Sequence, residues 1–179
     1  TARALLGKEC SIELVRAAWD NPAITQPLWE DHLQEWMALA TGSAADISLF
    51  MEEYGRALAP GVYFSSLLAA ITADAVNEAL NSSATVAIAA SDGLWIPNTE
   101  TTKHFVPCAA HVDDIVVVHG SPERPRVSIV AAKSLQLTEV DQLDRLRPQY
   151  QVLVDGIDSG SEISPQAWQR IVQRALVAT

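Results

Sequence analysis

Apolar residues recur at three- and four-residue steps through the first 80 residues, the spacing of one face of an amphipathic α-helix. Asn21-Pro22 interrupts this pattern because proline disfavours helical backbone at the residue before it. Asp46 is suited to cap a later helix, and Ala59-Pro60-Gly61 is a stop signal. The pattern and its breakers predict helical segments over residues 5–19, 27–40, 46–58 and 62–80, the last ending near Asn81-Ser82-Ser83.

From residue 84 the hydrophobic period changes to that of short strands. Gly, Pro, Ser or Asp residues separate the apolar runs, and no helical pattern intervenes between them. Short strands in direct succession indicate an antiparallel barrel or sandwich rather than a parallel sheet with crossover helices. The predicted strands lie at residues 85–90, 105–106, 114–119, 126–131 and 150–154.

A final helix is predicted from Ser164-Pro165, where serine is suited to the N-cap and proline to the first turn. One face of this helix is apolar and consists of Trp168, Ile171, Val172 and Ala175. A helix of this length is marginal without packing, so the apolar stripe must lie back on the strands or meet another chain. The fold class is therefore α+β, with an N-terminal helical bundle, an antiparallel β-barrel over about residues 84–157, and a helix from about residue 165.

Composition limits the class of protein. The chain has 179 residues, of which 49% are hydrophobic and 19% charged, enough for one large or two small domains with a core. The apolar content excludes intrinsic disorder, and no apolar run approaches the length that spans a bilayer. The chain begins Thr1-Ala2-Arg3, without an initiator methionine or a signal-like apolar segment, which indicates a trimmed or processed cytosolic protein.

Charge and cysteine usage narrow the choice of partners. Twelve basic and 22 acidic residues give a net charge of −10, which repels a phosphate backbone and an anionic membrane surface. We therefore expect neither nucleic acid nor a membrane as a partner. Cys10 and Cys108 stand far apart without CxxC spacing, which supports neither a zinc site nor a disulfide framework. Two buried thiols in a reducing compartment are expected, and the predicted localisation is cytoplasmic.

Generic catalytic motifs are absent from the sequence. The four histidines form no HExxH pair, and the chain has no GxGxxG, GxxxxGK[ST] or GxSxG pattern. The neighbouring acids Asp113-Asp114 and Glu52-Glu53 point apart on a strand or helix, so they do not imply a catalytic dyad. No catalytic residue and no metal ligand is predicted from these patterns. On this ground alone, a helical-plus-β binding module of unknown function remains open.

Four stretches together support a more specific interpretation. They are LFMEEYGRALAPGVY at 49–63, VAIAASDG at 86–93, KHFVPCAAHVDDIVVV at 103–118, and LDRLRPQY at 143–150. In this order and spacing they resemble the acyl-CoA dehydrogenase family, especially the actinobacterial type that acts on steroid and other bulky acyl-CoA thioesters. The early segment 13–20 also fits. The resemblance extends over nearly the whole chain.

The resemblance implies three parts: an N-terminal helical domain over residues 1–82, a middle β-barrel domain over 83–160, and the first helix of a missing C-terminal helical domain over 161–179. It implies FAD-dependent α,β-dehydrogenation of an acyl-CoA thioester. In the family the catalytic base and part of the flavin grip come from the helical bundle, so this chain alone is expected to be inactive. Because the last helix begins that oligomer-building bundle, we expect its apolar stripe to meet another acyl-CoA dehydrogenase chain.

The resemblance also assigns candidate cofactor-binding residues. Ala90 and Ser91 match positions whose backbone and hydroxyl meet flavin or substrate, and Phe105 and Val106 match the strand beside the isoalloxazine. Ala90-Ser91 replaces the usual Thr-Glu pair, and Pro107 removes a donor where the family often has threonine. FAD is therefore expected to bind weakly or not at all to the chain alone. Two functions are open besides the binding module: a dehydrogenase subunit or fragment, and a non-catalytic structural subunit of a heteromer.

Overall fold

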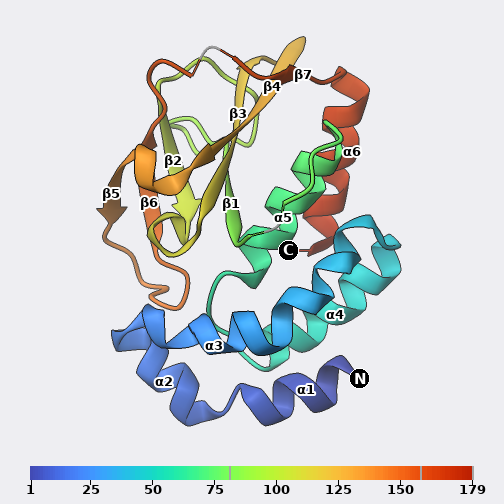
Figure 1. Ribbon diagram of the computed structural model, residues 1–179, viewed down its shortest axis with the longest axis vertical. Helices are drawn as coiled ribbons and strands as arrows, with labels where there is room; N and C mark the ends of the chain where they lie inside the picture. The colour runs from blue at the N-terminus through green and yellow to red at the C-terminus, as the bar shows by residue number, and fades with distance from the viewer. Residues whose placement is uncertain (81, 158, 179) are drawn as a thin grey trace.

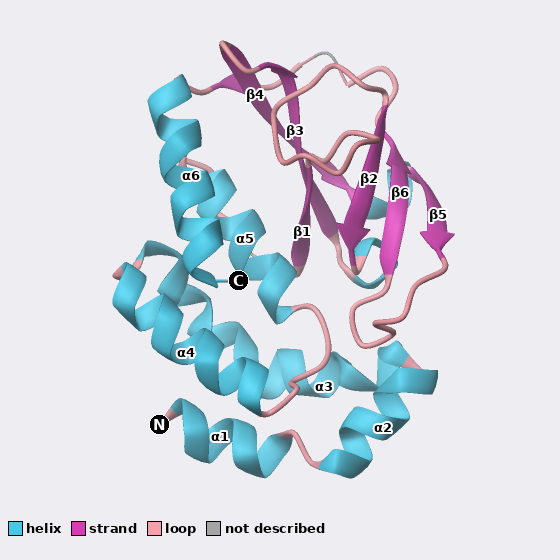
Figure 2. Ribbon diagram, turned by 180° about the vertical axis from the view of Figure 1, so that it is seen from behind, coloured by secondary structure: helices cyan, strands magenta, loops and turns pink. Residues whose placement is uncertain are grey.

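The computed structural model describes residues 1–80, 82–157 and 159–178, and it places two β-sheets above a layer of helices (Figure 1). Helices α1 to α4 form the lower layer, while α5 and α6 lie side by side along one face of the strands (Figures 1 and 2). The predicted order of helices, strands and a final helix is confirmed. The predicted helix end at Asn81 falls outside the described residues.

The first apolar stripe is divided between two helices, α1 (Ala2–Glu9) and α2 (Ile12–Asp20). Ser11 begins α2 as its N-cap, because its hydroxyl accepts a hydrogen bond from the backbone N–H of Leu14 at 3.2 Å. The second predicted helix is a continuous but irregular helical segment. It comprises η1 (Pro22–Thr25), α3 (Gln26–Leu28), the π-helical η2 (Trp29–Leu33) and the 3-10 helical η3 (Gln34–Thr41).

Helix α4 (Ala44–Arg56) begins earlier than the sequence predicted. Ser43 is its N-cap in place of Asp46, since the Ser43 hydroxyl accepts from the Asp46 N–H at 3.1 Å and donates to the Asp46 carboxylate at 2.7 Å. The helix ends at Arg56. Leu58 follows it with a left-handed backbone (φ 49°), and the N–H of Ala59 bonds back to the carbonyl of Tyr54 at 3.1 Å.

Helix α5 (Tyr63–Asp74) is central and almost completely buried, but it is shorter than predicted. The carbonyl of Ala73 accepts from the N–H of Glu78 at 3.1 Å, and Asn77 has φ 58°. This is a Schellman-type ending in which asparagine takes the left-handed position that glycine usually occupies. The alanine- and leucine-rich pattern continues past this point, so it did not reveal the end.

The predicted closed barrel is wrong. The strands form two open sheets, and within the described residues no ladder joins them. The four-stranded sheet has the order β1 (Ala84–Ala87), β3 (Asp114–Ser121), β4 (Arg124–Ala131), β7 (Ser161–Glu162), and the three-stranded sheet has the order β2 (Thr102–Pro107), β6 (Gln149–Leu153), β5 (Gln136–Val140). All paired strands are antiparallel except β1 and β3, which are parallel.

A β-bulge interrupts the pairing of β2 with β6. The register of β2 on β6 shifts between Lys103 and Val106, where Phe105 has a left-handed φ of 54°. Two hydrogen bonds outside the ladders connect β2 with the β1 region: the Thr85 hydroxyl donates to the Pro107 carbonyl at 2.6 Å, and the His104 N–H donates to the Ala89 carbonyl at 2.9 Å, beyond the end of β1. Strand pairing of this kind is non-local, and the hydrophobic pattern does not encode it.

The two faces of β3 explain its unbroken apolar run. Val116 and Val118 belong to the main core with residues of α5 and α6, whereas Ile115 and Val117 belong to a second core between the sheets. Because both faces of the strand are buried, its residues do not alternate between apolar and polar. Thus the four-stranded sheet is covered by helices on one face and by the smaller sheet on the other.

Helix α6 (Pro165–Ala178) is capped as predicted, with the Ser164 hydroxyl accepting from the Ala167 N–H at 3.1 Å. Its apolar stripe, however, is buried within this chain. Trp168, Ile171 and Ala175 belong to the main core, where α6 packs on α4, α5 and β4. The expectation that this stripe meets another chain is therefore wrong. The same core extends through all three predicted ranges, whose boundaries remain a prediction.

Candidate functional site

The candidate cofactor residues lie where β1 ends and β2 begins, on either side of an irregular loop over residues 88–101. Ala90 and Ser91 start this loop, and its first turn is closed by a hydrogen bond from the Gly93 N–H to the Ala90 carbonyl at 3.0 Å. Gly93 has φ 79°, and a Cβ added to it would lie 3.5 Å from the ring of Phe105. The turn and the β2 aromatic are therefore adjacent.

The bulge in β2 directs Phe105 and Val106 to different surroundings. Phe105 is 43% exposed, and its left-handed backbone is uncommon for a bulky residue. Leu94 and Ile96 of the loop are also exposed. Val106, in contrast, is 1% exposed in the core between the sheets. The structure thus leaves Phe105 available to a ligand, while the Val106 side chain is already enclosed.

Ser91 is engaged by a carboxylate from its own loop. The backbone N–H of Ser91 donates to one Glu100 oxygen at 3.0 Å, and its hydroxyl donates to the other at 3.4 Å. No sequence motif indicates Glu100 as a partner of Ser91. Nine residues separate it from Ser91 in a segment without regular structure, and no periodicity signals such a contact.

Asn98 organises the rest of the loop. Its side-chain amide donates to the carbonyls of Ile88 at 2.8 Å and Ile96 at 2.9 Å, and its side-chain oxygen accepts from the Glu100 N–H at 3.1 Å. The same oxygen accepts from the amine of Lys103 at 2.6 Å. The dipeptide Pro97-Asn98 is a loop signal, but it does not indicate these partners.

Lys103 is completely buried, with no exposed surface. Its amine donates to the Asn98 carbonyl at 3.0 Å as well as to the Asn98 side chain. Burial lowers the pKa of Lys103 to about 8, and the nearby Glu100 carboxylate opposes this effect. Lys103 opens the motif at residues 103–118, but the family resemblance assigns it no role.

Other titratable groups are buried away from this loop. Cys10 and Cys108 are free and buried, as predicted, and burial raises their thiol pKa values to about 11 and about 12. The Tyr150 hydroxyl lies 3.3 Å from the ring of His111, whose pKa burial lowers. Across residues 1–80, 82–157 and 159–178, no three His, Cys, Asp or Glu side chains are arranged to hold a metal ion.

A cavity of about 390 Å³ adjoins the end of the loop. Glu100 and Thr101 line it from the loop, His119 and Arg124 from β3 and β4, and Asp155 from the segment after β6. Arg124 is paired with Glu162 at 3.2 Å. Charges of both signs meet in this cavity, so it does not select an anion or a cation by net charge alone.

The residues of this chain do not fit a self-sufficient FAD site. The N–H and hydroxyl of Ser91 are taken by Glu100, Pro107 has no N–H, and the Val106 side chain is enclosed. Only the exposed face of Phe105, among the four candidates, offers a surface on which a ring could stack. We therefore derive no chemical step through a flavin held by this chain alone.

No protein-family model matches the chain, and no curated protein matches it. Solved structures do match. The steroid ACAD Tcur3481-Tcur3483, in a variant form, gives a TM-score of 0.72 at 17% identity over 97% of this chain and 58% of that chain. The ChsE4-ChsE5 complex from Mycobacterium tuberculosis gives a TM-score of 0.68 at 14% identity, over 98% of this chain and 57% of that chain.

A glutaryl-CoA dehydrogenase from Mycobacterium smegmatis, in complex with FADH2, gives a TM-score of 0.55 at 11% identity, over 97% of this chain and 59% of that chain. The chain thus has the fold of acyl-CoA dehydrogenases, as the sequence motifs predicted. It spans less than two thirds of the length of these matched chains. None of the described helices is long and apolar enough to cross a membrane.

Proposed function

We propose that this chain is a subunit of an acyl-CoA dehydrogenase assembly, which performs FAD-dependent α,β-dehydrogenation of a bulky acyl-CoA thioester such as a steroid derivative. The observation that carries the proposal is the match of 97% of the chain to a steroid ACAD at a TM-score of 0.72. The order and spacing of four sequence motifs, which resemble the same family, support it independently.

Within that assembly, we assign this chain a structural role. A second, longer dehydrogenase chain supplies the catalytic base and most flavin contacts. The engagement of Ser91 by Glu100 supports this division of labour, because it satisfies the donors that a flavin would use. Pro107 supports it too, since proline cannot donate from its backbone. One of the matched structures, ChsE4-ChsE5, is itself a complex of two proteins.

A second candidate function is that the chain contributes directly to flavin binding. The exposed ring of Phe105 favours it, and the loop that meets this ring at Gly93 continues into the exposed side chains of Leu94 and Ile96. Aromatic and aliphatic side chains of this kind can stack against a planar cofactor. In this case the longer chain would supply the base, and Phe105 would touch the ring system in the assembled enzyme.

Enzyme activity tests the proposal. The chain is tagged and purified from its native source, and the eluate is assayed for acyl-CoA-dependent reduction of a dye acceptor. We expect activity in the eluate and none with the chain expressed alone. Turnover by the chain alone would refute the structural role. An inactive eluate that contains no acyl-CoA dehydrogenase chain would refute the whole proposal.

A further inference from the structure

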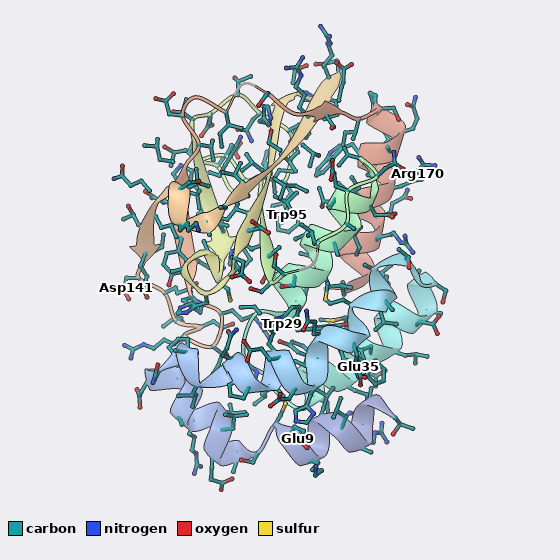
Figure 3. The ribbon with its side chains drawn as sticks, viewed as in Figure 1. Glu9, Trp29, Glu35, Trp95, Asp141 and Arg170 are labelled. Atoms are coloured by element: carbon teal, nitrogen blue, oxygen red, sulfur yellow. The ribbon has the colours of Figure 1, made fainter. Side chains whose placement is uncertain are left out.

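The loop over residues 88–101 has a defined shape although it contains neither helix nor strand. Trp95 holds it from one side, since this side chain packs against the main core and lies between the strands and α5 in Figure 3. Asn98 holds it from within through bonds to Ile88, Ile96 and Glu100. The position of Glu100, and with it the contact to Ser91, therefore depends on where Asn98 lies.

Lys103 fixes Asn98 in turn. Its amine reaches both the backbone carbonyl and the side-chain oxygen of Asn98, at 3.0 and 2.6 Å. Burying an ammonium group is expensive unless it is compensated, and an apolar side chain of similar length would fill the same space without that penalty. An apolar side chain at position 103 would lack the two hydrogen bonds to Asn98.

We propose that Lys103 is the positioning residue of the candidate site: it anchors Asn98, and the anchored loop brings Glu100 to Ser91 and leaves Phe105 exposed beside Gly93. The anchoring stands on these contacts alone. Its consequence for a ligand at Ser91 or Phe105 rests on the proposed function. Lys103 acts through Asn98 and Glu100, and nothing in its own position requires it to touch a ligand.

The anchor has a defined dependence on pH. The folded pKa of Lys103, about 8, lies below the ordinary value of 10.5, so the closed loop favours the neutral amine. Opening the loop to water would restore the ordinary value and take up a proton. Between about pH 8 and 10.5, the equilibrium constant for opening the loop therefore falls with rising pH, on the order of tenfold per pH unit. Among the described residues, Glu100 is the charged group that acts on this amine. Its carboxylate raises the pKa of Lys103 and so opposes the effect of burial.

Hydrogen exchange of the full chain tests this proposal from pH 7 to pH 10, with rates corrected for the intrinsic effect of pH. In the wild type, we expect the protection of amides in residues 88–101 to rise above about pH 8, on the order of tenfold per pH unit. Lys103→Met should abolish this rise and exchange faster than the wild type at pH 10. The matched control Lys133→Met, which changes an exposed lysine, should keep the wild-type profile.

Exchange of residues 88–101 in Lys103→Met that matches the wild type at pH 10 overturns the proposal, and so does a Lys103→Met profile that rises like the wild type. If Lys103→Met fails to fold, Asn98→Ala decides. This second variant should speed exchange of the loop on the order of tenfold at pH 7, while residues 114–131 stay protected. An unchanged loop in Asn98→Ala would contradict the anchor. Since no flavin or acyl-CoA is needed, this failure is separate from failure of the proposed function.

Discussion

The backbone N–H of Ser91 donates to the carboxylate of Glu100 at 3.0 Å, so a residue of the same loop satisfies the donor that the family resemblance assigned to a cofactor. The Ser91 hydroxyl points to the other oxygen of this carboxylate at 3.4 Å. A cofactor that used these donors would have to displace Glu100. This competition is the main physical reason for assigning the chain a structural role.

Removing the carboxylate should loosen the loop without unfolding the protein. Glu100→Ala leaves the Ser91 N–H without its partner, and we expect a loss of about 1 kcal/mol in local stability. Exchange of the Ser91 amide should accelerate about fivefold. Hydrogen exchange measures this change, with Glu35→Ala as the control, because Glu35 is an exposed acid on a distant helical segment. Equal exchange at Ser91 in both variants would show that Glu100 does not hold it.

The left-handed backbone of Leu58, just after α4, predicts opposite effects for two leucine-to-glycine changes. Leu58 has φ 49°, a backbone region that glycine adopts without steric penalty, so Leu58→Gly should stabilise the protein by about 0.5 kcal/mol. Leu49 is similarly exposed but lies inside α4, where Leu49→Gly should destabilise by about 1 kcal/mol. Urea unfolding gives both values. Destabilisation of equal size by both changes would contradict the left-handed ending.

The packing of α6 within the chain predicts a large effect for Trp168→Ala. Trp168 is 8% exposed in the main core, and its truncation should destabilise the protein by about 3–5 kcal/mol. Leu176 on the same helix is 68% exposed, so Leu176→Ala should change stability by less than about 0.5 kcal/mol. Thermal unfolding compares the two variants. A small effect of Trp168→Ala would mean that the stripe is not packed in the isolated chain.

The buried thiols predict a loss of stability at alkaline pH. Burial raises the pKa of Cys10 to about 11 and that of Cys108 to about 12, above the ordinary value of 9.0. The contribution of the protonated thiols to the free energy of unfolding is complete below pH 9. It is lost as the pH rises toward the pKa values of the folded protein, at roughly 1 kcal/mol per thiol and pH unit.

Urea unfolding at pH 8, 9 and 10 under reducing conditions measures this slope. Between pH 9 and 10, the free energy of unfolding should fall less steeply in the double variant Cys10→Ala, Cys108→Ala than in the wild type. The difference in slope should be roughly 2 kcal/mol per pH unit. Lys103 has the opposite sign in this range and is present in both proteins, so the difference isolates the thiols. Parallel slopes would show that the thiols titrate normally in the folded chain.

Local patterns predicted much of the secondary structure. The apolar run over residues 114–119 was identified as a strand because it is short and flanked by turn residues. Strand β5 was missed because its residues are exposed or half-buried and do not alternate strongly. The barrel was wrong for a different reason. Pairing between β1 and β3, or between β2 and β6, depends on contacts far apart in the chain, which periodicity does not contain.

The candidate site shows the same limit. The family resemblance identified Ser91 and Phe105, which the structure places beside the same turn. It did not identify the contacts through which Lys103, Asn98 and Glu100 shape the loop. Irregular loops make specific side-chain contacts without a repeating pattern, and a lysine is expected at the surface rather than fully buried. Only the three-dimensional structure connects these residues.

Native mass spectrometry of the tagged chain, purified from its source under mild conditions, identifies the proteins and cofactor that assemble with it. We expect a complex that contains this chain, a longer acyl-CoA dehydrogenase chain and FAD. Once separated from the complex and passed through gel filtration with added FAD, this chain should carry no flavin. A monomer or homo-oligomer of this chain that retains stoichiometric FAD of its own would rule out the structural role.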